Sequence, residues 1–417
     1  MESLYTKFLE SGGVSTDTRT LKPGDLYFAL RGPNFNGNQY AAKAIEEGAD
    51  YAIIDDKAFE GPNTILVEDS LKALQDLARY HRDRFKGKLL ALTGSNGKTT
   101  TKELLNRVLS TKYKTLATKG NLNNHIGVPL TLLEMTDETE IAIIEMGANH
   151  VGEIENLSRI ADPEFGLITN IGEAHTETFG GIEGVFKGKT ELFNHINKKQ
   201  GTIFVNTADP RLKPFGDLDH AICYPNEDVS FIGAEPMIRF GLGEKEIKTQ
   251  TIGAYNYQNI TAAICVGRYF QISDKAIAEA ISTYVSGNQR SQVISKGLLK
   301  IVMDGYNANP TSMSAALESF TRLQGSKHVI LGDMKEVEDS INRHRTFGKE
   351  LKSLGFKTVI LVGPEMKHAS EQVDGSKWFE TSEAAKDYLK SNPIKEGNLL
   401  IKGSRSMKME KVLEAIS

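Results

Sequence analysis

Residues 89–100 have the sequence LLALTGSNGKTT, in which a short aliphatic run passes directly into a glycine-containing loop, a lysine and two threonines. An aliphatic run of this length is typical of a buried strand in a parallel sheet. The residues beyond the loop have helical spacing, and we expect a helix over residues 101–110. A strand, a tight loop and a helix in this order favour an α/β fold with a mostly parallel sheet.

The loop has the residue types that bind a nucleotide triphosphate. Glycines allow successive backbone N–H groups to point at phosphate oxygens, and the helix N-terminus adds partial positive charge. Lys98 would add a full charge, and the Thr99 hydroxyl is a ligand that Mg²⁺ accepts. The alternative is a glycine-rich turn capped by threonines. The common phosphate-loop pattern requires glycine at position 92, where this chain has Leu92, so the shorter TGSNGKT spacing argues against a generic GTPase.

Short aliphatic runs alternate with helical stretches on both sides of this loop. Strands are predicted before it at residues 25–30, 51–55 and 64–68, with a helix at 70–85, and after it at residues 141–146, 165–169, 202–205, 299–303, 329–331, 358–362 and 399–401. A Lys-Gly-Lys segment after residue 85 and a new βα alternation near residue 298 divide the chain into blocks. We therefore predict three α/β domains, at residues 1–85, 86–293 and 294–417, the last with a doubly wound sheet.

Composition excludes several classes of protein. The 417 residues include 50 Lys+Arg and 54 Asp+Glu, a net charge of −4, which gives no strongly basic surface for nucleic acid. No apolar run reaches about 18 residues, and the first ten residues are too polar for a signal peptide, so we predict a cytoplasmic protein without a membrane span. Cys223 and Cys265 form no CxxC pair, which excludes a disulfide framework and a cysteine zinc site.

Two polar residues follow predicted strands of the middle block. Glu145 lies at the end of the strand at residues 141–146, and His175 follows the strand at 165–169. Ligands of open α/β sheets gather beyond the carboxyl ends of the strands, so both residues are candidates for a metal site near the nucleotide. Mg²⁺ takes oxygen ligands, which Glu145, Thr99 and phosphates supply, whereas imidazole is a less usual ligand. A lone loop histidine can equally be structural.

Three other segments have ordinary structural interpretations when only their residues are considered. Residues 187–191 (KGKTE) indicate a solvated helix face, and residues 121–129 (NLNNHIGVP) indicate a turn. Residues 15–19 (STDTR) indicate a capped turn, although their hydroxyls and the guanidinium of Arg19 would also suit a pyrophosphate or a uracil ring.

Taken together, these and later segments resemble the Mur ligase family. The resemblance runs in order from Ser15 to Glu410. Its motifs are TGSNGKTTTKE (93–103), GNLNNHIGVPLTLL (120–133), IEMGANHVGEI (144–154), TNIGEAHTETFGGIEGVFKGKTELF (169–193), YNANPTSM (306–313), LGDMKE (331–336) and KGSRSMKME (402–410). YNANPTSM and KGSRSM are more specific than the phosphate loop, and they match the member of the family that uses a dipeptide.

The resemblance implies a fold and an activity. The fold has an N-terminal UDP-sugar-binding α/β domain, a central ATPase and a C-terminal Rossmann-like domain. The activity is ATP-driven amide formation through an acyl-phosphate, which joins D-alanyl-D-alanine to UDP-N-acetylmuramoyl-tripeptide. The implied cofactors are two Mg²⁺ ions and a lysine carbamylated by CO₂. The implied partners are ATP and the two peptide substrates, and the protein is expected to be a monomer.

The resemblance also implies residue roles. ATP binding is implied for Gly94, Ser95, Asn96, Gly97, Lys98, Thr99, Thr100, Asn256, Asn259, Arg290 and Asp304. Catalysis is implied for Lys98, Glu145, His175 and Lys189, and metal binding for Thr99, Glu145, His175 and carbamylated Lys189. UDP-sugar binding is implied for Ser15, Thr16, Asp17, Thr18 and Arg19, and dipeptide binding for Asn307, Asn309 and Arg405.

Two positions depart from the family's patterns. Tyr255 stands where the G-x-H-N-x-x-N pattern has histidine, so no role is carried over to it. Glu338 stands where the family usually has glycine, and we expect a local change of the loop there without loss of activity.

Three alternative functions remain open. The neighbouring ligase that adds the third residue to UDP-N-acetylmuramoyl-dipeptide carries, in its diaminopimelate-specific form, a DNPR motif that this chain lacks. Folylpolyglutamate synthetase shares the phosphate loop but not YNANPTSM or the UDP-reading segment. A catalytically inactive, regulatory relative would be expected to have lost Lys98, Glu145, His175 or Lys189, and all four are present.

Overall fold

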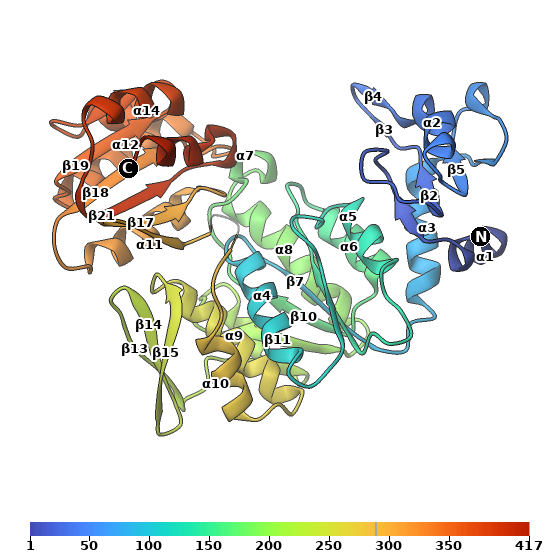
Figure 1. Cartoon of the computed structure of the whole chain (residues 1–417). Helices are drawn as coiled ribbons and strands as arrows, with labels where there is room; N and C mark the ends of the chain where they lie inside the picture. The colour runs from blue at the N-terminus through green and yellow to red at the C-terminus, as the bar shows by residue number, and fades with distance from the viewer. Residues whose placement is uncertain (288–289, 417) are drawn as a thin grey trace.

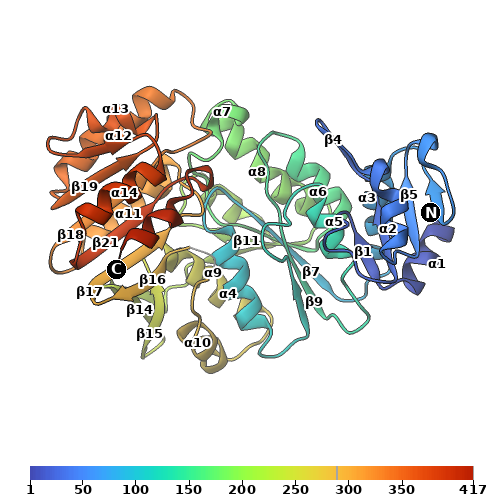
Figure 2. The same ribbon diagram turned by 45° about the horizontal axis from the view of Figure 1, so that its top comes forward.

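The computed structural model describes residues 1–287 and 290–416. Three α/β units follow one another along the chain, and the first and last lie at opposite ends of the molecule (Figures 1 and 2). The predicted fold class, three domains with mostly parallel sheets, is confirmed. The domain boundaries stay predictions; the boundary placed after residue 293 lies within a strand, β16 (Gln292–Lys296).

The N-terminal unit has a parallel sheet in the order β1-β2-β5-β6. Its strands are β1 (Gly13–Ser15), β2 (Asp25–Phe28), β5 (Tyr51–Ile54) and β6 (Thr64–Leu66), and β3 (Arg31–Gly32) pairs separately with β4 (Phe35–Asn36). Its helices are α1 (Glu2–Glu10), α2 (Ala41–Glu46) and α3 (Ser70–Arg82). The Asp69 carboxylate accepts a hydrogen bond from the Lys72 N–H, which caps α3 where the sequence predicts that helix to begin.

The central unit has a six-stranded parallel sheet in the order β12-β11-β10-β7-β9-β8. The strands are β7 (Lys88–Thr93), β8 (Thr115–Ala117), β9 (Ile141–Glu145), β10 (Phe165–Ile168), β11 (Thr202–Asn206) and β12 (Ala221–Tyr224). The helices are α4 (Lys98–Leu109), α5 (Gly127–Leu132), α6 (Glu153–Ala161), α7 (Thr176–Phe179), α8 (Ile182–Asn197), α9 (Asn256–Tyr269) and α10 (Asp274–Ser282). Because β7 lies between β10 and β9, the loop after it is central to the ligand-binding edge.

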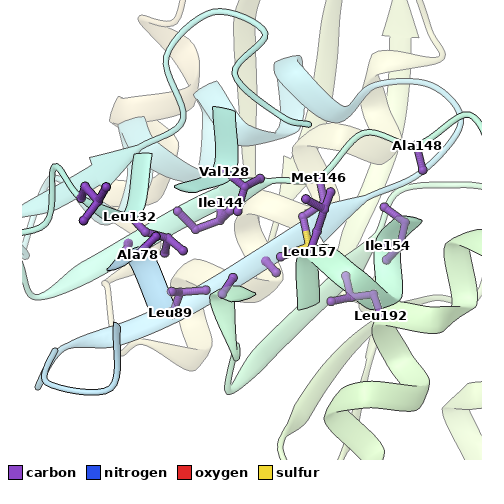
Figure 3. Packing of buried hydrophobic residues seen from close by; sticks show 14 of the residues in the cluster. Ala78, Leu89, Val128, Leu132, Ile144, Met146, Ala148, Ile154, Leu157 and Leu192 are labelled. Carbon is purple, nitrogen blue, oxygen red and sulfur yellow. The ribbon is translucent and has the colours of Figure 1, made fainter. Parts of the chain in front are cut away.

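Helices cover both faces of this sheet. Leu89 and Ala91 of β7 belong to the cluster on one face, with α5, α6 and α8, whereas Leu90 and Leu92 belong to the cluster on the other face, with α4, α9 and α10. The continuous aliphatic run of β7 follows from this double covering. The first cluster continues into α3 of the N-terminal unit, as Ala78 shows (Figure 3), so the two units share a core.

A three-stranded antiparallel sheet follows, which the sequence analysis does not predict. Its strands are β13 (Val229–Ala234), β14 (Met237–Leu242) and β15 (Lys245–Ile252), in that order.

The C-terminal sheet has the order β16-β17-β21-β18-β19-β20, with every pair parallel except β16 and β17. Its other strands are β17 (Leu298–Asp304), β18 (Lys327–Gly332), β19 (Thr358–Val362), β20 (Lys377–Phe379) and β21 (Glu396–Lys402). Its helices are α11 (Pro310–Thr321), α12 (Ser340–Ser353), α13 (Met366–Ser370) and α14 (Ser382–Ser391). Among the described residues, no helix combines the length and apolar character needed to cross a bilayer.

Candidate active site

A cavity of about 870 Å³ lies where the phosphate loop meets the C-terminal unit. Its lining includes residues of the loop, Glu145 and His175 from the central unit, and Arg290, Asp304 and Asn307 from the segment beyond. Leu71 and Gln75 of α3 also line it, so all three units contribute to one space. Residues that are far apart in the sequence are therefore brought together at the predicted edge of the central sheet.

The phosphate loop adopts a conformation that depends on its glycines. Gly94 has φ +142° and a Cβ there would lie 2.0 Å from the Thr169 hydroxyl oxygen, and Gly97 has φ +78° at the N-terminus of α4. Thr169 donates to the Asn96 carbonyl at 2.6 Å, and Ser95 donates to the Gly172 carbonyl at 2.9 Å. The segment after β10 thus fixes the loop against the sheet.

Lys98 folds back over this loop. Its ammonium donates to the Gly94 carbonyl at 2.8 Å and lines the cavity. Burial lowers its pKa, against the opposing effect of the Glu145 carboxylate. α4 begins at Lys98, three residues before the predicted start, so the N–H groups of its first turn face the same space.

Glu145 ends β9 and is 2% exposed. Its carboxylate accepts hydrogen bonds from the Thr99 hydroxyl at 3.0 Å and from the Asn123 side-chain amide at 2.8 Å. The Lys102 ammonium lies 3.8 Å from the same carboxylate. The segment of residues 121–129 is therefore more than the turn that its composition indicates, because Asn123 reaches the site and α5 begins at Gly127.

The oxygen donors at Glu145 and Thr99 fit Mg²⁺ better than a transition metal. In the described part of the chain there is no group of three or more His, Cys, Asp or Glu side chains that could hold a metal by themselves. Mg²⁺ suits such a site, because it usually takes one or two carboxylates and completes its shell with phosphate oxygens and water.

Lys189 is buried in α8, so the interpretation of residues 187–191 as a solvated helix face is wrong for this residue. Its ammonium donates to the Ala148 carbonyl at 3.0 Å. Burial and the charge of Lys98 lower its pKa well below the usual value. A buried amine that loses its proton readily is the form that reacts with CO₂, so the residue fits the carbamate that the resemblance implies.

His175 lines the cavity from a left-handed conformation (φ +57°) at the start of α7. Its Nδ1 pairs with the Glu336 carboxylate of the C-terminal unit. Burial lowers the pKa of the imidazole, which favours the neutral, ligating form.

Asn256 and Asn259 lie side by side at the start of α9 and line the cavity. The Asn259 amide donates to the Asn256 side-chain oxygen at 2.8 Å, and the Thr101 hydroxyl donates to Asn259 at 3.1 Å. Tyr255 hydrogen-bonds Ser291 through its hydroxyl at 2.6 Å, and burial raises its pKa, so it remains a neutral phenol.

The C-terminal unit supplies a second group of polar residues to the cavity. The Arg290 guanidinium lies over the Tyr306 ring, 3.6 Å from its centroid, in a cation–π contact. Asp304 accepts a hydrogen bond from Lys402 at 2.6 Å. Lys402 was not among the predicted site residues, although KGSRSM, which contains it, was singled out.

The residues predicted to bind the dipeptide are not all brought together. Asn307 lines the cavity, whereas Asn309 is 2% exposed and its side chain makes two hydrogen bonds within the protein. Its amide donates to the Asn96 side-chain oxygen at 2.8 Å, and its oxygen accepts from the Ser312 N–H at 2.9 Å. Arg405, with a side chain 59% exposed, lies 3.5 Å from Glu410 and is not among the described residues that line the cavity.

The segment of residues 15–19 lies in the N-terminal unit, outside the lining of this cavity as far as the chain is described. The Arg19 guanidinium, 85% exposed, pairs with Asp17 at 2.6 Å. Ser15 accepts a hydrogen bond from the Asp17 N–H at 3.2 Å. The capped turn expected from the residues alone is therefore present, and Thr16 and Thr18 are half-buried within it.

Comparisons with known proteins agree with this architecture. Three family models match the chain: "Mur ligase family, catalytic domain" over residues 10–82, "Mur ligase middle domain" over residues 92–267, and "Mur ligase, glutamate ligase domain" over residues 289–405.

One curated relative is the UDP-N-acetylmuramoyl-tripeptide–D-alanyl-D-alanine ligase of Bacillus subtilis (strain 168), 35% identical over 96% of this chain and 92% of the relative. Two solved structures are also similar. MurF from Acinetobacter baumannii is 32% identical, covers 96% of this chain and 92% of its own, and has a TM-score of 0.88. MurF ligase from Thermotoga maritima in complex with ADP is 27% identical, covers 98% and 97%, and has a TM-score of 0.86.

Proposed function

The chain belongs to the Mur ligase family, and we propose that it joins D-alanyl-D-alanine to UDP-N-acetylmuramoyl-tripeptide in an ATP-dependent reaction. The products are the UDP-N-acetylmuramoyl-pentapeptide precursor of peptidoglycan, ADP and phosphate. The observation that carries the proposal is the cavity in which the phosphate loop, Glu145 and the more C-terminal residues Arg290 and Asp304 meet. Such a cavity suits a reaction that brings ATP and two peptides together.

ATP is proposed to bind with its phosphates on residues 94–100, where Lys98 and the first N–H groups of α4 offset the negative charge. Asn256, Asn259 and Arg290 line the space beyond the loop, and Asp304, which also lines it, would accept hydrogen bonds from the ribose hydroxyls. Glu145 and Thr99 would hold the Mg²⁺ on the phosphates, and His175 with carbamylated Lys189 would hold a second Mg²⁺. Bound there, the two ions would neutralise charge on the transferred phosphoryl group.

The reaction then follows in two steps. The terminal carboxylate of the tripeptide attacks the γ-phosphorus, an acyl-phosphate forms, and ADP leaves. The neutral amine of D-alanyl-D-alanine attacks the acyl carbon. The nitrogen loses one proton to solvent, and the tetrahedral intermediate expels phosphate to give the amide. Lys98, whose ammonium lies over the loop, would stabilise the charge that develops on the transferred phosphate. The contribution of the chain is mainly positioning and charge stabilisation.

The two peptide substrates are proposed to bind on opposite sides of the nucleotide. Residues 15–19 would hold the UDP moiety of the tripeptide substrate. The N-terminal unit that contains them reaches the cavity through α3, whose residues Leu71 and Gln75 line it. Asn307 and Asn309 would face the dipeptide, and Arg405 would pair with the carboxylate of the dipeptide. Arg405 is proposed for this role because it lies just after β21, the strand that ends at Lys402. We also propose that the enzyme acts as a cytoplasmic monomer, where ATP and the UDP-linked precursor are available.

The test is ATP-dependent phosphate release with UDP-N-acetylmuramoyl-tripeptide and either D-alanyl-D-alanine or single amino acids. We expect release only with D-alanyl-D-alanine, together with a product of the pentapeptide mass. Release with a single amino acid on the dipeptide precursor would instead assign the neighbouring ligase activity. No release with any pair would overturn the proposal in favour of a regulatory binding protein. Tripeptides that contain lysine or diaminopimelate, compared side by side, define the third residue.

A further inference from the structure

Lys102 is a buried cation to which the proposed reaction assigns no role. It lies on α4 one helical turn after Lys98, so the two lysines project from the same face of the helix. Its side chain is only 5% exposed. A lysine is rarely buried to this extent unless it is paired, because removing an ammonium from water is costly.

The partner of Lys102 is the carboxylate at the centre of the site. Its Nζ lies 3.8 Å from the Glu145 Oε2 and 3.4 Å from the Gly120 carbonyl oxygen. Glu145 is also held by Thr99 and Asn123, so a cation, a hydroxyl and an amide converge on one carboxylate. These three contacts fix the orientation of the Glu145 carboxylate. The ammonium of Lys102 compensates its buried negative charge before a ligand binds.

The two lysines of α4 occupy different positions relative to the cavity. Lys98 and Glu145 line it, whereas Lys102 is not among its described lining residues. The ammonium of Lys102 therefore influences a bound ligand through Glu145, while that of Lys98 faces the ligand directly.

We propose that Lys102 is a positioning residue that holds the Glu145 carboxylate oriented and charge-compensated, so that the ligand set for the nucleotide-bound Mg²⁺ is already formed in the free enzyme. The inference rests on the metal role proposed for Glu145. Residues that orient a metal ligand typically change metal affinity by about 10- to 100-fold when they are removed.

The experiment measures ADP binding to the full chain by isothermal titration calorimetry, once with MgCl₂ and once with EDTA. For Lys102→Met we expect the Kd of ADP in MgCl₂ to rise about tenfold, while the Kd in EDTA stays within about twofold of the wild-type value. Lys102→Arg keeps the charge and is expected to recover most of the metal effect. Lys98→Met is the matched contrast on the same helix face, and it should weaken ADP binding under both conditions.

Two results would overturn the inference: an unchanged Kd in MgCl₂ for Lys102→Met, or an equal loss in MgCl₂ and in EDTA. Glu145→Gln separates this failure from failure of the proposed metal site. If Glu145→Gln removes the effect of Mg²⁺ while Lys102→Met retains it, only the role of Lys102 is wrong. If Glu145→Gln retains the effect, the metal role of Glu145 is wrong.

Circular dichroism melting checks that each variant is folded. If Lys102→Met does not fold, Lys102→Gln takes its place, because the amide can still donate a hydrogen bond without carrying charge. For Lys102→Gln we expect the ratio of the Kd in EDTA to the Kd in MgCl₂ to fall at least about threefold below the wild-type ratio. A wild-type ratio in that variant would overturn the inference.

Discussion

At the scale of the residue, Lys189 is buried, and the proposed second metal site depends on its conversion to a carbamate. We expect Lys189→Ala to lower the rate of ligation by about 100-fold or more, because the proposed second metal ion would lose its carbamate ligand. Short-chain carboxylic acids should partly restore the activity of this variant by supplying the missing oxygens. Phosphate release measures the rate, and ¹³C NMR in ¹³C-bicarbonate should show a carbamate signal in the wild type that the variant lacks. Full activity of Lys189→Ala would contradict the assignment.

The lowered pKa of Lys189 also has a consequence for stability. Between the folded pKa and the usual value of 10.5, the unfolded chain binds more protons than the folded chain, so the contribution of this residue to stability falls as the pH decreases. Lys189→Met removes that titration. In bicarbonate-free buffer, we compare the melting temperatures of the variant and the wild type at each pH. The melting temperature of the variant minus that of the wild type should be larger at about pH 7 than at about pH 10. A difference that is independent of pH would show that the buried amine does not titrate in this range.

Individual residues differ in how far the sequence could predict them. Glu145 and Thr99 were predicted because a strand end and a phosphate loop have recognisable local patterns. The burial of Lys102 and Lys402 was not predicted, because nothing in the order of residues distinguishes a buried lysine from a solvated one. Only the pairing with Glu145 and with Asp304 in the folded chain identifies them.

At the scale of the element, the phosphate loop depends on a conformation that glycine adopts without strain. In Gly97→Ala, a Cβ would lie 2.5 Å from the Asn259 side-chain oxygen at φ +78°. We expect this change to weaken ADP binding by about tenfold or more, since about 1–2 kcal/mol of backbone strain adds to the clash. Gly243→Ala is the matched control, because it also has positive φ but no neighbour within 4 Å. It should lose similar stability and keep its ADP affinity by calorimetry, and an equal loss of affinity in both variants would contradict the argument.

The N-terminus of α11 depends on Asn309 for both stability and position. The Asn309 oxygen caps the helix by accepting from the Ser312 N–H, and its amide donates to Asn96 of the phosphate loop. Asn309→Ala should lower the free energy of unfolding by about 1 kcal/mol in urea titrations. Asn309→Asp should preserve that free energy, because an aspartate also caps well, but it should weaken ADP binding because a carboxylate cannot donate to Asn96. Equal loss of stability in the two variants would argue against the cap.

Elements with a regular local pattern were predicted well, and strands without a clean alternation of apolar and polar residues were not. The strand β7 and the helix α3 were predicted within a few residues, since each has a continuous apolar run or a capped amphipathic pattern. The antiparallel strands β13 to β15 were missed. Their outer residues are polar or exposed, and Phe231 and Ile232 lie on the surface, so their sequence does not alternate cleanly.

At the scale of the whole molecule, contacts between the central and C-terminal units hold the cavity together. The Arg343 guanidinium lies 2.9 Å from the Glu173 carboxylate, and the Glu173 N–H donates to the Thr311 hydroxyl at 3.0 Å. The Glu338 N–H donates to the Thr176 hydroxyl at 3.2 Å. The family resemblance implied ATP-binding residues in both units, but no local pattern of the sequence shows which surfaces of two separate sheets meet.

The three contacts just named are polar, so the separation of the two units should be sensitive to a change of charge where they meet. In Arg343→Glu, two carboxylates would face each other, and we expect the radius of gyration measured by small-angle X-ray scattering to increase and the KM for ATP to rise. The effect on KM should be about fivefold or less, since a partly exposed ion pair contributes only about 0–1 kcal/mol. The double variant Arg343→Glu with Glu173→Arg restores opposite charges and should recover both quantities. If the double variant stays as open as the single one, another contact holds the units together, and the Glu173–Arg343 pair only accompanies closure.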